Sequence, residues 1–233
     1  MGDFQQIHFD HTITLDIESV PMGERDMSML KSTEELLVEA PQSYSKVKQE
    51  AWAEKKSQEL VAAMEKEYRD RSFNPMKGRI VCIGIQFDDN PTEMIHYDED
   101  EKQMLLNLAK RLKEFDRYIY TSYVIGNMIY DFDIRFIIQK AFKFDVKDLI
   151  IYLPIHKYDK RIYDLSDRFN LGVYGKHTKL VDLCDFFGIK TPKDDLDGSM
   201  VCDAFARGEI DRIEKYCAKD VNSSYLCYKK MQI

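Results

Sequence analysis

Thr-Ile-Thr-Leu-Asp-Ile-Glu, residues 12–18, is the stretch that decides the fold of this 233-residue chain. Apolar or β-branched residues alternate with polar ones, which predicts a β-strand. Asp16 and Glu18 share one face of it, because side chains on a strand repeat every two residues. A carboxylate on an otherwise apolar strand is costly to remove from water unless it meets a cation. The stretch therefore predicts a strand that carries two candidate metal ligands.

Further strand and helix patterns follow along the chain. Strands are predicted over 80–87, 92–97 and 118–124, and helices over 101–114, 132–142, 178–187, 199–206 and 209–230. Thr178 is the expected N-cap and Gly188 the expected end of one of these helices. Residues 145–175 fit no single pattern. Early strands, late helices and a strand–helix–strand unit between them predict an α/β or α+β fold around one mixed sheet.

A charged segment over residues 27–72 interrupts this pattern. Its second half, residues 45–71, is rich in helix formers and carries a narrow apolar stripe at Leu60, Met64 and Tyr68. This predicts a helix that lies against the domain rather than inside it. The chain length suits one large core. We therefore expect a single domain over 1–233 with an insertion at 27–72.

The overall composition narrows the classes of function. The chain holds 41 Asp and Glu against 34 Lys and Arg, which argues against a broad basic surface for duplex DNA. No apolar run is long enough to span a bilayer, and the first residues do not resemble a signal peptide. Five cysteines without a C-x-x-C pair favour reduced thiols over disulfides or a zinc site. These features predict a soluble cytoplasmic protein.

Two more acidic motifs occur further along the chain. Phe132-Asp133 follows a loop that contains Gly126-Asn127, and Tyr216 lies four residues before Asp220, on the same face of a predicted helix. Taken alone, each motif is more often a solvated face, an N-cap or a surface pair. Taken together, four carboxylates from separate elements suit two Mg²⁺ or Mn²⁺ ions, which prefer oxygen ligands and can cleave phosphodiesters.

The motifs, in this order, resemble those of the DEDD exonuclease superfamily, which has a ribonuclease-H-like fold, and of its tyrosine subgroup. Thr14-Leu15-Asp16-Ile17-Glu18 resembles the first motif, Phe132-Asp133-Ile134-Arg135-Phe136 the second, and Tyr216-Cys217-Ala218-Lys219-Asp220-Val221 the third. Residues 78–84 and 197–201 are similar to a stand-alone branch related to the proofreading domain of family-B DNA polymerases. The resemblance implies an α/β fold with a mixed central sheet flanked by helices.

The resemblance also implies a role for each site residue. Asp16 would bridge two metal ions, Glu18 and Asp220 would share one of them, and Asp133 would serve the other. Tyr216 would orient the attacking water. The expected substrate contacts are Ile17, Asn127, Phe132 and Lys193.

The chain departs from the family pattern near the second motif. Met128 stands where the family has an asparagine, with Asn127 one position away, and Arg135 replaces a usual proline. This predicts a reshaped loop after Val124.

The resulting functional hypothesis is a 3′→5′ exonuclease that acts on the 3′ end of a single strand, with DNA favoured and RNA as the near alternative. A catalytically silent nucleic-acid- or protein-binding module on the same fold is the competing hypothesis. The third hypothesis is a metal-binding protein that hydrolyses nothing. Tyr216 argues against this hypothesis, because a site that only binds metal would not need a tyrosine. Lys157, Lys160 and Arg161 either meet substrate phosphates or lie in a solvated loop. Protein partners and oligomeric state do not follow from the sequence.

Overall fold

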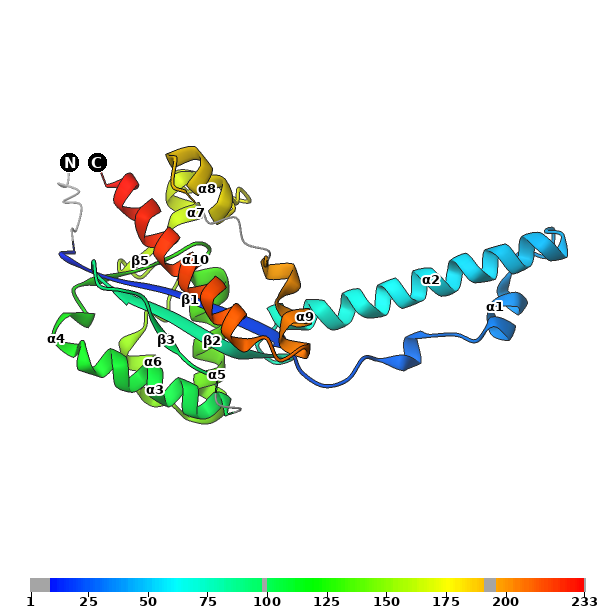
Figure 1. The fold of residues 1–233 in the computed structure, drawn as a ribbon, viewed down its shortest axis with the longest axis horizontal. Helices are drawn as coiled ribbons and strands as arrows, with labels where there is room; N and C mark the ends of the chain where they lie inside the picture. Colours follow the sequence, from blue (N-terminus) through cyan, green and yellow to red (C-terminus); the bar gives the residue numbers. More distant parts are fainter. Residues whose placement is uncertain (1–8, 98–99, 191–195, 233) are drawn as a thin grey trace. The chain divides into compact units, whose positions relative to one another are not determined.

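The computed structural model describes residues 9–97, 100–190 and 196–232. A single mixed sheet organises the larger part of the chain (Figure 1). Its strands lie in the order β3-β2-β1-β4-β5. Their bounds are β1 His11–Pro21, β2 Gly78–Phe87, β3 Glu93–Ile95, β4 Ser122–Gly126 and β5 Ile162–Asp164.

Strand directions fix which ends of the strands meet. β4 runs parallel to both β1 and β5, whereas β3 runs antiparallel to β2. The backbone N–H of Asp88, just after β2, donates to the carbonyl of Thr12 near the start of β1 at 3.0 Å, so β2 runs antiparallel to β1. β1, β4 and β5 therefore run in the same direction, and their register places Asp16, in the middle of β1, level with the ends of β4 and β5, where Asn127 and Asp164 lie.

Helices cover both faces of the sheet. On one face α3 (Glu101–Glu114), α5 (Arg135–Phe144) and α6 (Lys147–Tyr152) pack on one another. On the other face α10 (Ile210–Met231) packs against β4 and against α7, α8 and α9. The bounds of the remaining helices here are α4 Asp116–Ile119, α7 Leu165–Phe169, α8 Leu180–Phe187 and α9 Val201–Ala206. This arrangement matches the predicted α/β class, a mixed central sheet flanked by helices.

The alternation along β1 assigns its two faces. Ile13, Leu15 and Ile17 are buried in the core cluster that includes residues of α3 and α5. Asp16 and Glu18 lie at the alternate positions, so their side chains point to the face covered by α10. The strand pattern thus turns both acidic side chains toward the C-terminal helix.

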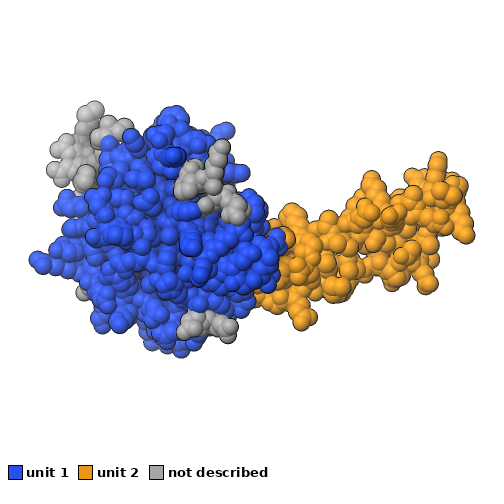
Figure 2. All heavy atoms as spheres, viewed as in Figure 1, with its two compact units in different colours: residues 1–19, 79–233 blue, residues 20–78 orange. Residues whose placement is uncertain are grey.

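Residues 20–78 form a second compact unit (Figure 2). α1 (Thr33–Glu39) begins with a capping box, in which Ser32 and Glu35 each accept a hydrogen bond from the other's backbone N–H. α2 (Lys46–Asp70) packs against α1 and covers the predicted helical stretch of residues 45–71. The predicted 27–72 insertion lies within this unit. That the whole chain works as one domain stays a prediction.

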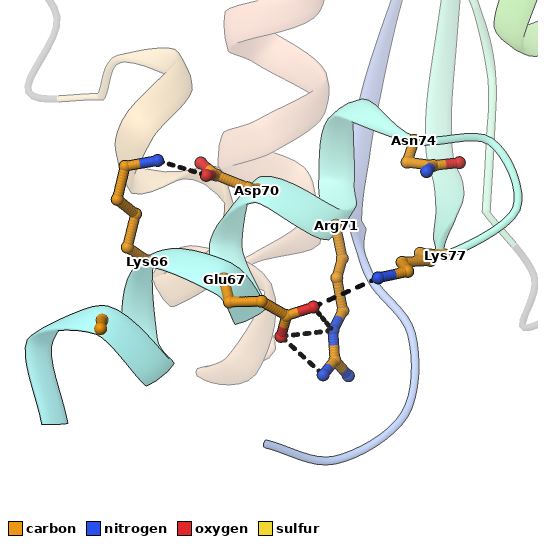
Figure 3. Close-up of a pocket in the computed structure, with 7 residues that line it drawn as sticks. Lys66, Glu67, Asp70, Arg71, Asn74 and Lys77 are labelled. Carbon is orange, nitrogen blue, oxygen red and sulfur yellow. Dashed lines mark hydrogen bonds and ion pairs between the residues drawn. The ribbon is translucent and has the colours of Figure 1, made fainter. Parts of the chain in front are cut away.

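A surface hollow of about 420 Å³ lies in this second unit, between the end of α2 and the loop that follows it. Figure 3 shows its charged side chains held by one another: Glu67 accepts hydrogen bonds from Arg71 and Lys77, and Lys66 pairs with Asp70. Since cations and anions alternate there, the hollow presents no dominant sign of charge to a ligand.

Several predicted boundaries are wrong. The strand expected over 118–124 begins at Ser122, because Thr121 and Ser122 both donate to the carbonyl of Tyr118 and turn the chain there. Thr178 is not the N-cap of α8, which is Lys179; its backbone N–H donates instead to the Ser166 hydroxyl.

Two predicted helices begin differently from the sequence pattern. The helix expected over 132–142 begins with a π-helical turn, Tyr130–Ile134, and continues as α5. The helix expected over 199–206 begins with a 3₁₀ turn, Gly198–Met200, because Asp197 accepts a hydrogen bond from the Ser199 backbone.

Gly84 allows α10 to approach the sheet closely. A Cβ atom added there would lie 2.7 Å from Cγ2 of Val221 and 3.1 Å from Sγ of Cys217. Gly84→Ala should therefore lower the free energy of unfolding by about 1–3 kcal/mol, the usual cost of overpacking, as measured by urea denaturation. Gly198→Ala is the matched control, since nothing lies within 4 Å of its added Cβ. If the two variants have the same free energy of unfolding, α10 moves away from the added methyl group without loss of stability, and the close approach at Gly84 does not constrain the fold.

Candidate metal centre

Three acidic side chains from opposite ends of the sequence meet at one point. Asp16 and Glu18 come from β1 and Asp220 comes from α10, and each offers a carboxylate oxygen within 4.8 Å of the others. All three side chains are partly exposed. Oxygen ligands at this spacing suit a hard divalent cation.

The packing of α10 on the sheet brings Asp220 to β1. Cys217, one turn before Asp220, donates its thiol to the carbonyl of Asp16 at 3.6 Å. Cys217 is fully buried, and it lies against Gly84 of β2. The close approach at Gly84 and the contact of Cys217 with Asp16 therefore fix the position of Asp220 relative to β1.

Asp133 reaches the same strand from the π-helical turn. Its Oδ1 accepts a hydrogen bond at 3.1 Å from the backbone N–H of Ile17, the residue between Asp16 and Glu18. Only 2% of Asp133 is exposed. Asp133 does not belong to the group of three, but burial raises its pKa and the charge of Asp16 raises it further. The structure thus brings all four predicted carboxylates to one region.

The electrostatics of this cluster favour a bound cation. Burial raises the pKa of Asp16, and the charge of Asp220 raises it further. Burial and the charges of neighbouring carboxylates, Asp16 first, raise the pKa of Glu18 in the same way. Oδ2 of Asp16 is buried and has no hydrogen-bond partner among the residues that the structure describes. A cation would supply the missing partner and relieve the repulsion, so these residues fit a metal.

Tyr216 stands beside the carboxylates on the same face of α10 as Asp220. Burial raises the pKa of Tyr216 well above its ordinary value, and the charges of Asp220 and Glu18 add to this effect. A hydrogen bond with Asp220 also favours the protonated form. Tyr216 therefore remains a neutral phenol that can donate a hydrogen bond at neutral pH.

Asp164, at the end of β5, is a residue that the sequence analysis missed. Its Oδ1 accepts hydrogen bonds from the backbone N–H groups of Met128 and Asp167, at 3.3 and 3.1 Å. Met128 has a φ of 58°, a conformation that side chains other than glycine adopt rarely. Asp164 therefore holds the loop before Asp133 in an unusual shape. Asp164 lies within residues 145–175, which fitted no single sequence pattern, and its role as the N-cap of α7 emerges only in the structure.

The expected substrate contacts fall into different surroundings. Ile17 is 3% exposed and lies in the core, and Phe132 is partly buried with its ring 5.7 Å from that of Phe136. Asn127 donates from Nδ2 to the carbonyl of Thr178 at 3.2 Å. Lys193 lies outside the described residues. Their contacts with a substrate stay predictions.

Two comparisons with known proteins identify the family of the chain. A family described as a predicted 3′-5′ exonuclease related to the exonuclease domain of PolB matches residues 94–233, which include Asp133, Tyr216 and Asp220. The chain belongs to this family. It is also 32% identical over 166 residues to an uncharacterized protein of Methanocaldococcus jannaschii, a match that covers 67% of this chain and 88% of the relative.

The family membership confirms the resemblance to the family-B polymerase exonuclease domain and the α/β fold. The matched region does not include β1, so Asp16 and Glu18 join the site through their geometry alone. Assignment to the tyrosine subgroup stays a prediction. Throughout 9–97, 100–190 and 196–232, no helix combines the length and apolar character needed to cross a membrane.

Repulsion among the carboxylates predicts a pH effect on the metal-free protein. Because burial and Asp220 raise the pKa of Asp16 above its ordinary 3.8, the folded state holds a proton that the unfolded chain has released. The free energy of unfolding therefore falls as pH rises above that value. Asp16→Asn removes this group, so in EDTA the free energy of unfolding of the variant should rise relative to that of the parent as pH increases above about 4.

Urea denaturation across this pH range checks the expectation. Asp185→Asn is the control, because Asp185 is an exposed carboxylate on α8. A constant difference between parent and Asp16→Asn at all pH values would contradict the repulsive cluster.

Proposed function

We propose that this protein is a metal-dependent 3′→5′ exonuclease that removes nucleotides from the 3′ end of a single strand. The observation that carries the proposal is the convergence of Asp16, Glu18 and Asp220, with a buried oxygen of Asp16 that lacks a hydrogen-bond partner among the described residues. The family relationship supports the type of reaction and its direction.

Each carboxylate has a distinct part in this proposal. Asp16 would hold two divalent ions, with Glu18 and Asp220 completing the position of one of them. Asp133, anchored to the backbone of Ile17, would hold the second ion directly or through water. Two Mg²⁺ or Mn²⁺ ions bound there would supply the positive charge that stabilises the attacking and leaving oxygens of a phosphodiester.

Tyr216 supplies a group that metal binding alone does not need. Its neutral hydroxyl lies beside Asp220 and can hold the attacking water in line with the scissile bond. This favours hydrolysis over metal storage. The ring of Tyr216 also contributes to packing. Tyr216→Phe separates the two roles, because it keeps the ring and removes the hydroxyl.

The preference for a single strand rests on a site that closes around a frayed 3′ terminus, and the charge of the chain argues only against a broad surface for duplex DNA. The chain has a net charge of −7, so its surface offers little sequence-independent attraction to duplex DNA. A site that grips a few terminal nucleotides and whose acidic groups are neutralised by metal needs no broad basic face. DNA is the favoured substrate because the family is related to a DNA polymerase domain, and RNA stays the near alternative.

Activity should depend on Mg²⁺ or Mn²⁺ and start at the 3′ end. A 5′-labelled DNA oligonucleotide should shorten one nucleotide at a time on a denaturing gel, and EDTA should stop the reaction. A matched RNA oligonucleotide tests the choice of sugar. Release of internal fragments, or full activity in EDTA, would be incompatible with the proposal.

Tyr216 and Asp220 should respond differently to substitution, although they lie on one helix face. Asp220→Ala removes a metal ligand and should nearly abolish turnover, with weaker Mn²⁺ binding. Tyr216→Phe keeps the ring and should lower turnover by about 10²-fold to 10⁴-fold, the range for a positioned proton-transfer group. Its single-strand binding should match that of the parent.

Tyr228→Phe, on the same helix within a cluster of aromatic rings, is the matched control and should cut at the parental rate. If Tyr216→Phe also cuts at the parental rate, the tyrosine serves packing alone. If the parent binds single strands and never cuts them, the protein is the silent binding module instead.

A further inference from the structure

The loop from Asn170 to Thr178 is closed at its base by side chains. Nδ2 of Asn170 donates to the Thr178 hydroxyl at 2.9 Å and to the carbonyl of Ser166 at 2.7 Å. The backbone N–H of Thr178 in turn donates to the Ser166 hydroxyl at 2.8 Å. These bonds hold both ends of the loop, so its tip is presented in one conformation. We refer to residues 170–178 as the tyrosine loop.

The tip of the tyrosine loop exposes apolar side chains. Tyr174 is fully exposed, Leu171 is 89% exposed and Val173 is 55% exposed. Leu171 also has a φ of 56°, which is rare for a leucine. This φ belongs to the end of α7, where the backbone N–H groups of Leu171 and Gly172 donate to the carbonyls of Arg168 and Asp167 and close the helix. The feature that points to a contact outside the chain is the group of three exposed apolar side chains at one loop tip.

Basic side chains lie in and beside the loop. Residues 168–181 contain Arg168, Lys176 and Lys179 but neither Asp nor Glu, although the chain carries a net charge of −7. The nearest acidic residues, Asp167 and Asp182, lie just outside this basic stretch. Lysine is depleted in protein–protein interfaces. Exposed aromatic rings among basic side chains are instead typical of surfaces that bind single-stranded nucleic acid.

Hydrogen bonds connect the tyrosine loop to the candidate metal centre. The carbonyl of Thr178, at the end of the loop, accepts from Asn127. The next residue, Met128, donates to Asp164, whose charge in turn acts on Asp133. The loop is therefore fixed beside the segment that leads into Asp133, at the ends of β4 and β5 that lie level with Asp16 of the metal centre.

We propose that the tyrosine loop binds the single strand upstream of its 3′ end, with the ring of Tyr174 stacked on a nucleobase and Lys176 near a phosphate. The inference rests on the proposed function, since it assigns to the same site a surface that holds its substrate. Stacking works with every base and with either sugar, so the contact adds affinity without sequence preference.

Binding of a 5′-fluorescein oligothymidylate of about 12 nucleotides, followed by anisotropy in EDTA, tests this role apart from cleavage. Tyr174→Ala should weaken binding by about 5-fold to 150-fold, the range for loss of one stacked base. Tyr174→Phe keeps the ring face and should bind like the parent. Tyr120→Ala is the matched control, because Tyr120 is 55% exposed but precedes β4, at the opposite end of that strand from Asn127.

The charge contribution is measured in the same assay. Lys176→Ala should reduce the slope of log affinity against log salt by about 0.7, as expected for one lost phosphate contact with a single strand. Lys110→Ala, on α3, should leave the slope unchanged. If the loop binds upstream of the terminal nucleotides, the loss in Tyr174→Ala should be smaller for a trinucleotide than for the strand of about 12 nucleotides.

The outcomes separate the two proposals. If the parent binds the strand through Tyr174 but never cuts, the loop inference holds and the proposed function fails. If the parent cuts from the 3′ end and Tyr174→Ala binds with parental affinity, the loop inference alone is overturned. An equal loss in Tyr120→Ala would also overturn it, because the effect would then not be specific to the loop.

Discussion

The mutual repulsion of four carboxylates in one partly enclosed region is the constraint on which the rest of this structure depends. Burial raises the pKa of Asp16, Glu18 and Asp133; the charge of Asp220 raises those of Asp16 and Glu18 further, and the charge of Asp16 raises that of Asp133. A fold keeps such a group together only if its scaffold outweighs the repulsion or if cations neutralise it. Two hydrogen bonds belong to this scaffold. The thiol of Cys217 donates to the carbonyl of Asp16, and the carboxylate of Asp133 accepts from the backbone N–H of Ile17.

Two glycines make that scaffold possible. Gly84 leaves room for Val221 and Cys217, so α10 lies close to β2 and carries Asp220 and Tyr216 to the strand. Gly126 does the same at the end of β4, since an added Cβ would lie 2.9 Å from the carbonyl oxygen of Leu15. The chain after Gly126 can then turn sharply through Met128, which Asp164 holds by its backbone N–H. Backbone approach at these points positions the site more directly than any single side-chain contact.

Much of the fold and the main carboxylates could be predicted from the sequence because they follow simple periods. Alternation along residues 12–18 put Asp16 and Glu18 on one face, and a spacing of four put Tyr216 beside Asp220. The π-helical turn before α5, the left-handed Met128 and the role of Asp164 could not be predicted, because they depend on tertiary contacts between β4, β5 and their loops. The tyrosine loop was missed for the same reason, since its closure by Ser166, Asn170 and Thr178 has no periodic signature.

We propose above all that Asp16, Glu18, Asp133 and Asp220 form one metal centre. Anomalous diffraction from crystals soaked in Mn²⁺ tests it most directly, because the signal locates the ion without reference to activity. The account predicts two Mn²⁺ peaks, one in contact with Asp16, Glu18 and Asp220 and one shared by Asp16 and Asp133. Strong Mn²⁺ peaks elsewhere on the protein, with none between these carboxylates, would contradict it.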